Sequence, residues 1–121
     1  MPLSAYSLNK MTDHLVGDDF TSRPHTADPG SGGTTGQITG ITYPTLGNGN
    51  WSNASAGDSV YNAAVAFGVL SATQSRTITH YSLWEGNNFV GSEALSAPVT
   101  VAANGTFTIN SGTISINGAS T

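Results

Sequence analysis

Apolar and small polar side chains alternate through residues 99–116. The apolar members of this alternation are Val99 and Val101, Phe107 and Ile109, and Ile114 and Ile116. Asn104-Gly105 separates the first two pairs, and Ser111-Gly112 separates the last two. Alternation with a period of two, interrupted by Asn-Gly, indicates antiparallel hairpins. The pattern therefore predicts a β domain that closes with two hairpins.

Further short apolar stretches give about seven predicted strands in all, a number and spacing typical of a small antiparallel β-sandwich. The predicted strands are 38–43, 60–70, 77–84, 88–94, 99–102, 106–109 and 113–116. The run at 60–70 is also compatible with a buried helix, because periodicity alone does not separate the two. Residues 18–37 and 45–58 are rich in Gly, Asn, Ser and Asp, which predicts irregular loops.

One helix is predicted near the N-terminus, over residues 4–16. Leu8, Met11 and Leu15 recur at helical spacing, Ser4 suits the N-cap, and Gly17 suits the end. Such a short helix is marginal alone in water, so it needs a partner surface. We therefore expect residues 1–17 to be a docking element and residues 18–121 to be a single β-sandwich domain.

Composition narrows the functional classes. The chain has 121 residues, 37% of them hydrophobic and 8% charged, a net charge of −4 and no cysteine. The three cations, Lys10, Arg23 and Arg76, are scattered, so no basic patch is predicted to bind nucleic acid or an anionic membrane. No apolar run approaches the roughly 20 residues of a membrane span, and no secretory signal precedes the helix. Disulfides and thiolate metal sites are excluded.

Potential metal ligands gather in the N-terminal quarter of the chain. They are Asp13, His14, Asp18, Asp19, His25 and Asp28. Their spacing fits no familiar ligand loop, and the closing Glu of an EF-hand is missing. Solvated loop and helix-end charges are the favoured interpretation, so no metal is predicted.

Catalytic residues are equally sparse. His80 lies in a strand and has no Gly-x-Ser-x-Gly nucleophile motif to serve. Glu85 and Glu93 flank a turn and could approach each other as a glycosidase pair does, although solvated hairpin charges explain them more simply. The sequence therefore predicts no enzyme and no cofactor.

Two tryptophans are candidate contact residues. Trp51 lies in a polar loop and Trp84 in a predicted strand. Both suit a subunit interface, where Trp is enriched, and Trp84 also suits the core. The predicted interface residues are Leu8, Met11, Leu15, Trp51 and Trp84. A glycan contact formed by Trp51 with Asn48, Asn50 and Asn53 is the alternative use of the loop.

Four segments, in this order, resemble a family of small tailed-bacteriophage virion proteins of the tail-fibre or tail-protein kind. They are LNKMTDHLV at 8–16, HTADPG at 25–30, TITHYSLW at 77–84 and ALSAPVTVAANGTFTINSGTISI at 94–116. The chain departs from the family where only residues 19–24, with Arg23-Pro24, precede the HTADPG turn. A first strand there is expected to be lost, shortened or replaced. The hairpin at 84–89 is also shorter than the family's.

The resemblance implies a non-enzymatic structural protein, assembled into virions in the host cytoplasm and bound to other virion proteins. A homo-oligomer is expected. Because the chain carries no shaft repeat, decoration of the capsid is favoured over a place in the tail or tail fibre. A host-glycan-binding module and a small hydrolase using His80, Glu85 or Glu93 are the other hypotheses.

Overall fold

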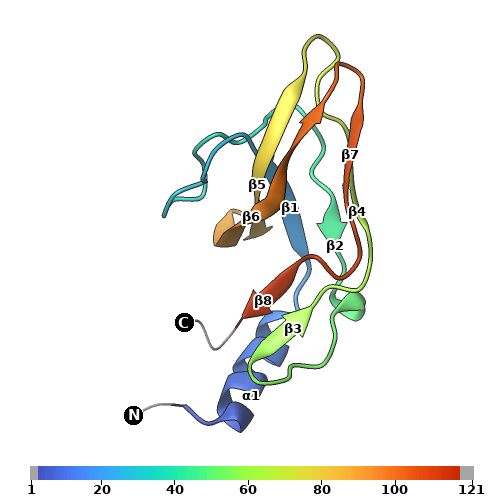
Figure 1. Cartoon of the computed structure of the whole chain (residues 1–121). Coiled ribbons are helices and arrows are strands. Elements are labelled where there is room, and N and C mark those ends of the chain that lie inside the picture. The colour runs from blue at the N-terminus through green and yellow to red at the C-terminus, as the bar shows by residue number, and fades with distance from the viewer. Residues whose placement is uncertain (1–2, 118–121) are drawn as a thin grey trace. The chain divides into compact units, whose positions relative to one another are not determined.

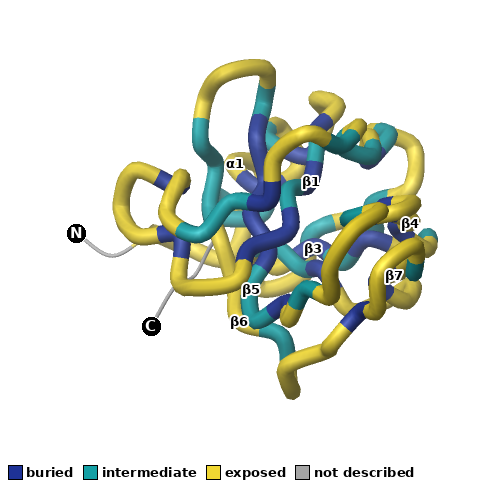
Figure 2. Tube along the Cα trace, turned by 90° about the horizontal axis from the view of Figure 1, so that it is seen from above, coloured by how far each residue is buried: buried dark blue, intermediate teal, exposed yellow. Residues whose placement is uncertain are grey.

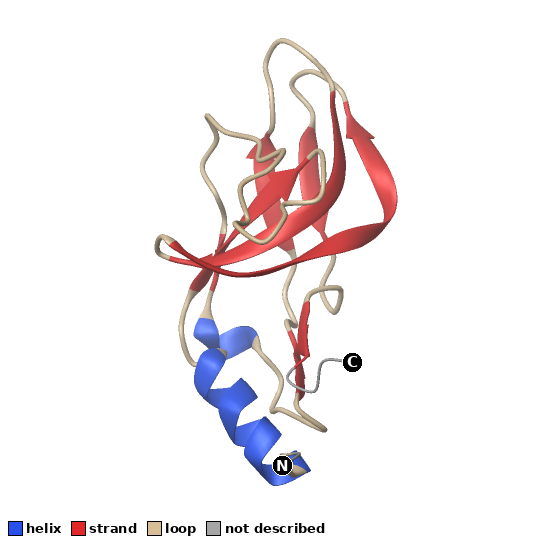
Figure 3. Ribbon diagram, turned by 90° about the vertical axis from the view of Figure 1, so that its left-hand side faces the viewer, coloured by secondary structure: helices blue, strands red, loops and turns tan. Residues whose placement is uncertain are grey.

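The structure is a computed structural model that describes residues 3–117. Within that range the chain forms one α-helix, one short 3-10 turn and eight strands (Figure 1). In chain order these are α1 (Ala5–Leu15), β1 (Phe20–His25), β2 (Thr45–Leu46), η1 (Asn48–Asn50), β3 (Asp58–Val60), β4 (Val65–Val69), β5 (Arg76–Glu85), β6 (Asn88–Val101), β7 (Thr106–Ile109) and β8 (Ser115–Asn117). The predicted class, mainly β with one N-terminal helix, is confirmed (Figure 3).

The strands form three sheets. The largest has four strands in the order β2-β1-β5-β6, and the others are the pairs β3–β8 and β4–β7. β5 is the centre of the large sheet, with β1 antiparallel on one side and β6 antiparallel on the other. Most pairs join strands that are far apart in sequence.

The chain divides into two compact units. Of the described residues, unit 1 contains 3–19, 46–65 and 109–117, and unit 2 contains 20–45 and 66–108. Helix α1 thus shares unit 1 with β3 and β8. The expected division into a docking helix at 1–17 and one sandwich at 18–121 stays a prediction.

Both units contain buried hydrophobic side chains, and the buried residues are dark blue in Figure 2. In unit 1 they are Val16, Leu46, Tyr61, Val65, Ile109 and Ile114, and in unit 2 Phe20, Ile38, Phe67, Leu70, Ile78, Tyr81, Leu83, Trp84, Val101 and Phe107. The rings of Phe67 and Phe107 join β4 to β7, with centroids 5.3 Å apart. The alternating pattern therefore identified the buried face of β7 correctly.

The helix begins and ends close to the predicted residues. Ser4 is the N-cap, and its hydroxyl accepts from the backbone N–H of Ser7 at 3.2 Å. Val16 is the C-cap, and the N–H of Gly17 donates to the carbonyl of His14 at 3.3 Å. These bonds satisfy backbone groups that a helix end leaves open.

The first strand, which was expected to be lost, shortened or replaced, is not lost. β1 spans Phe20–His25, includes Pro24, and pairs with β5 from Thr21↔Trp84 to His25↔His80. The carbonyl of Pro24 accepts from Ile38 on the side away from β5. The missing N–H of a proline in this position removes no bond from the β1–β5 ladder.

Two other predicted strands differ from the structure. Residues 38–43 form no strand, because Gly40 has a φ of +78°, outside the range of extended backbone. The run at 60–70 is neither one strand nor a helix: β3 ends at Val60, and β4 begins at Val65. The predicted loop at 45–58 contains β2 and η1, and Leu46 in β2 is fully buried.

The two C-terminal hairpins were also predicted wrongly. The predicted strands 88–94 and 99–102 are one strand, β6, whose register with β5 shifts between Ile78↔Val99 and His80↔Ala94. Asn104 does form a turn, with a φ of +64°, but β6 and β7 are not partners. β7 pairs with β4 and β8 with β3, so each turn carries the chain to a different sheet.

Candidate functional site

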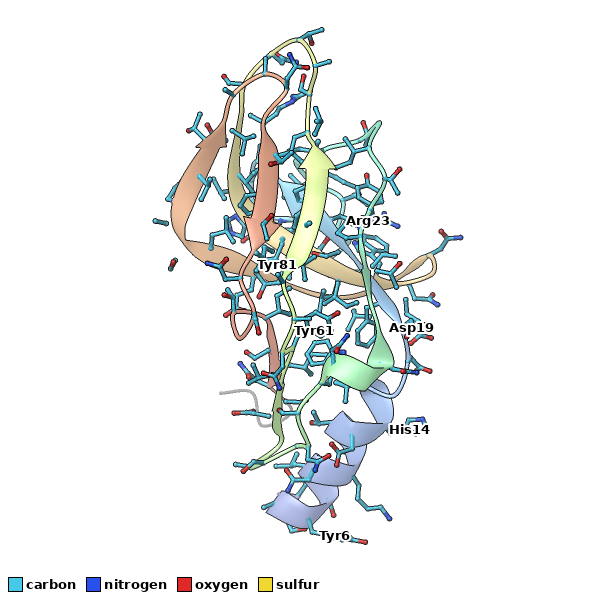
Figure 4. The ribbon with its side chains drawn as sticks, turned by 90° about the vertical axis from the view of Figure 1, so that its right-hand side faces the viewer. Tyr6, His14, Asp19, Arg23, Tyr61 and Tyr81 are labelled. Carbon is cyan, nitrogen blue, oxygen red and sulfur yellow. The ribbon has the colours of Figure 1, made fainter. Side chains whose placement is uncertain are left out.

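The predicted apolar stripe of α1 has an exposed and a half-buried part. Leu8 and Leu15 are half-buried, whereas Met11 is 60% exposed. Leu3 and Tyr6 are also exposed, at 49% and 69%. Figure 4 shows Tyr6 at the N-terminal end of the helix, pointing outward. Leu3 directly precedes the N-cap of the helix, Ser4. We call Leu3, Tyr6 and Met11 the outer helix residues.

Polar side chains of α1 hold the helix to the turn at 54–57. Thr12, which is buried, donates from its hydroxyl to the carbonyl of Gly57 at 2.6 Å. The N–H of Gly57 donates to Oδ1 of Asn9 at 2.6 Å, and the N–H of Ala54 donates to Oδ1 of Asp13 at 2.8 Å. The helix is therefore fixed within unit 1 while its outer residues stay exposed.

The potential metal ligands serve other purposes. Asp19 accepts from the N–H of Asn48 at 2.8 Å, and Asp28 accepts from the N–H of Gly30 at 2.9 Å. With Asp13 bonded to Ala54, three of the four aspartates fix turns. Across residues 3–117, no group of three or more metal-binding side chains comes together.

Trp51 packs within unit 1. Its ring meets Tyr61 edge-on, with centroids 5.1 Å apart at 60°. The amide of Asn50 reaches the Tyr61 hydroxyl at 3.5 Å, and the amide of Asn48 donates to the carbonyl of Gly17 at 3.1 Å. Two of the three asparagines considered for a glycan contact thus form hydrogen bonds within the protein, and all three are exposed.

Trp84 lies in the core of unit 2, only 6% exposed. The Arg23 guanidinium lies 4.0 Å from the centroid of its ring and 5.0 Å from that of Tyr43. Phe89 packs on Trp84 with centroids 5.3 Å apart. A cation between two aromatic rings is attracted by both, so this stack stabilises the sheet.

His25, considered above as a potential metal ligand, has a different partner in the structure. His25 and Ser82 are both fully buried, and Nε2 of His25 lies 2.7 Å from Oγ of Ser82. Nδ1 of His25 lies 2.8 Å from the carbonyl oxygen of Thr35. The indole N–H of Trp84 donates to Oγ of Ser82 at 2.8 Å.

These contacts fix the protons. The Thr35 carbonyl only accepts, so Nδ1 of His25 carries the hydrogen, and Nε2 accepts from the Ser82 hydroxyl. Burial lowers the pKa of His25 below its ordinary value, outweighing the Thr35 bond that raises it. A serine beside a histidine resembles a nucleophile and its base. Here no substrate can reach the buried pair, and a carbonyl stands where a triad has a carboxylate. The pair is structural.

Residues 26–37, which we call the covering loop, return to β1 after the HTADPG turn. The N–H of Thr26 donates to the carbonyl of Gly36 at 2.9 Å. Gly33 has a φ of +77°, and a Cβ there would lie 2.4 Å from Cδ1 of Phe89. The loop thus contacts the sheet at a position that only glycine fits.

The remaining catalytic candidates are not brought together. Glu85 pairs with Asn88, whereas Glu93 pairs with Tyr81 and accepts from its hydroxyl at 2.8 Å. Burial, and then this carboxylate, raise the pKa of Tyr81. His80 is bonded through Nδ1 to the hydroxyl of neighbouring Thr79 at 2.8 Å. The two glutamates therefore form no acid pair.

The family model described as podophage GP4 fiber I protein gp80 matches residues 2–117. The chain belongs to this family. It is therefore a phage structural protein of the fibre-like kind and a component of the virion. No curated protein matched it.

The family match bears on one earlier expectation. The resemblance to tailed-phage virion proteins is confirmed by the fiber I family match. In the part of the chain that is described, no helix is both long and apolar enough to cross a membrane. One sequence signal for the buried pair of His25 and Ser82 was missed. Ser82 follows Tyr81 and precedes Leu83 and Trp84, so it is a polar residue within an apolar stretch of a strand.

Proposed function

We propose that this chain is a non-enzymatic subunit of a phage tail fibre and that it attaches to a neighbouring virion protein through the outer helix residues. Membership of the fiber I family supports the fibre over the capsid-decorating role that the length of the chain favoured. The burial of the pair formed by His25 and Ser82 and the separation of Glu85 from Glu93 support a role without catalysis.

The exposed outer helix residues carry the proposal. Five large hydrophobic side chains are exposed in the described part of the chain, and three of them, Leu3, Tyr6 and Met11, lie within its first eleven residues. Burying one such side chain contributes about 1.5–3 kcal/mol, so three can anchor a contact. A homo-oligomer, and roles for Leu8, Leu15, Trp51 and Trp84 at the interface, stay predictions. The buried position of Trp84 suits a supporting role.

Assembly of particles tests the attachment. The double variant Tyr6→Ser with Met11→Ser should reduce incorporation of the chain into particles at least about tenfold. Each substitution removes about 1.5–3 kcal/mol of binding free energy, and a tenfold change requires roughly 1.4 kcal/mol. Val69→Ser with Val99→Ser is the matched control, since these side chains are 47% and 40% exposed and lie in unit 2. Equal loss in both variants would contradict attachment through the helix.

The copy number of the chain in wild-type particles separates the locations. Quantitative mass spectrometry should give a few copies per hundred of the major capsid protein if the chain is in a fibre. A ratio near one would instead indicate capsid decoration. Absence from particles would overturn the structural role and return attention to glycan binding, with Trp51→Ala as its test.

A further inference from the structure

Lys10 lies among the outer helix residues and carries a charge there. It is the only lysine in the sequence, and its side chain is exposed. Its ammonium lies 5.4 Å from the centroid of the Tyr6 ring, one turn earlier on α1. With about 3.6 residues per turn, Lys10 is about 200° around the helix from Thr12, which binds the turn at 54–57. The charge is therefore on the side of the helix that faces away from that turn.

Among residues 3–117, Lys10 is the only exposed Lys or Arg side chain. Arg23 and Arg76 are both half-buried, and Arg23 is stacked on the rings of Tyr43 and Trp84. The chain as a whole has a net charge of −4. An acidic protein thus has its one exposed Lys or Arg side chain within the surface through which attachment is proposed.

Lys10 has no anionic partner in the described part of the chain. Asp13 is the carboxylate closest to it along the helix, and its Oδ1 accepts from the N–H of Ala54 at 2.8 Å. The contact that the Lys10 ammonium does form, with the ring of Tyr6, leaves its N–H groups free to donate. The ammonium is therefore free to pair with an anion from outside the chain.

Attachment would remove water from this ammonium. Around the helix, Lys10 lies between Tyr6, about 40° away, and Met11, about 100° away, so a surface that covers both also covers Lys10. Burying a charge is costly unless it is paired and hydrogen-bonded. A carboxylate is the side-chain group that pairs with an ammonium most strongly. The helix of a second copy does not provide one, because face-to-face packing would bring lysine against lysine.

We propose that the helix binds a different virion protein that presents an Asp or Glu carboxylate within an apolar surface, and that this carboxylate pairs with Lys10. The inference rests on the attachment proposed above and specifies the chemistry of the partner. Leu3, Tyr6 and Met11 are attracted to any apolar surface. Lys10 adds selection, because an apolar surface without an anion would leave its charge unpaired.

Carbodiimide cross-linking of wild-type particles tests the pairing directly. The reagent activates a carboxylate, and the amine of Lys10 then forms an amide with it while the reagent leaves as a urea. Because the chain has one lysine, every lysine cross-link of this chain comes from Lys10. Mass spectrometry of the digested particles should find Lys10 joined to an Asp or Glu of another virion protein. Cross-links of Lys10 only to carboxylates of this same chain, or none at all, would overturn the proposal.

Substitution of Lys10 gives a second test, in particles assembled with wild-type and variant chains present together. Lys10→Met keeps the helix propensity but removes the charge, so it leaves the carboxylate of the partner unpaired. It should be incorporated at least about tenfold less than the wild-type chain. Lys10→Arg keeps the charge and should be incorporated much better than Lys10→Met. Gln74→Glu, exposed and in unit 2, changes the net charge by the same amount as Lys10→Met and should be incorporated normally.

The outcomes separate this inference from the attachment on which it rests. Loss of the double variant Tyr6→Ser with Met11→Ser, together with normal incorporation of Lys10→Met, would leave the attachment standing and overturn the acidic partner. Normal incorporation of Lys10→Met overturns it in any case. So would equal losses in Lys10→Met and Gln74→Glu, or in Lys10→Met and Lys10→Arg. Circular dichroism of the purified Lys10→Met chain should match the wild type, which separates lost pairing from lost folding.

Discussion

The helix of unit 1 and the covering loop of unit 2 are both held by polar side chains, yet the side chains that they expose differ in polarity. α1 is fixed by Asn9, Thr12 and Asp13, and exposes Tyr6 and Met11. The covering loop is fixed through His25 and exposes small polar residues, among them Thr26, Asp28, Ser31 and Thr34.

This difference shows that the bonds that hold a segment in place and the side chains that it exposes are separate properties. The polar bonds decide where each segment lies, while the side chains that they leave outside decide what the segment can contact. An exposed Tyr and Met favour association, because apolar surface gains by leaving water. Exposed Thr, Ser and Asp gain little. The helix is therefore the better candidate for attachment, and the loop for a solvent-facing cover.

The largest expected effect is a loss of stability in unit 2, where the covering loop contacts Phe89. Gly33→Ala should cost about 2–5 kcal/mol, combining about 1–2 for a left-handed alanine with about 1–3 for overpacking against Phe89. Urea unfolding followed by Trp84 fluorescence in a Trp51→Phe background measures this loss in unit 2.

Gly40→Ala is the matched control for this substitution. Gly40 has nearly the same φ, +78°, but no atom lies within 4 Å of the position of its Cβ. It should lose only the conformational part, about 1–2 kcal/mol. Equal losses at Gly33 and Gly40 would mean that the loop does not press on Phe89.

A smaller effect should follow from breaking the helix anchor in unit 1. Thr12→Val has nearly the same shape and helix propensity but leaves the Gly57 carbonyl without its donor, at a cost of about 1–3 kcal/mol. Thr12→Ser keeps the hydroxyl and should lose about 0.8 kcal/mol for the missing methyl group. Thermal unfolding compares them, and a valine variant as stable as the serine variant would contradict the anchor.

The smallest expected effect is a loss of stability at the N-cap of the helix. Ser4→Ala removes the N-cap and should cost about 1 kcal/mol, with loss of helical circular dichroism. Ser4→Asp should restore stability, because a carboxylate caps and also favours the positive end of the helix dipole. If alanine and aspartate behave alike, the first turn is held by other contacts.

Local chemistry predicted the parts of the fold that depend on neighbours in sequence. The capped helix at Ser4 and the strand at 106–109 follow from spacing and capping rules. The turn at Asn104 was also recognised. Alternation states which side chains are buried, but not which strand lies beside them, so β7 was paired with the wrong partner.

The remaining errors share a physical origin in distant contacts. Pro24 made a strand at this position unexpected. In the structure β1 pairs with β5 on one side, and the carbonyl of Pro24 accepts from the N–H of Ile38 on the other. The contact of His25 with Ser82 joins positions 57 apart and leaves no periodic signal in the sequence. Met11 is 60% exposed, and its role at an interface stays a prediction.

The pairing of β3 with β8 also affects the order of events during synthesis. Unit 1 needs residues 109–117 as well as the helix, so its closure waits until those residues have left the ribosome. Contacts between distant segments form slowly, because a long chain must first be ordered. The helix is made first, yet its support is complete last. A chain released before residue 109 would carry the helix without the β3–β8 pair of its unit.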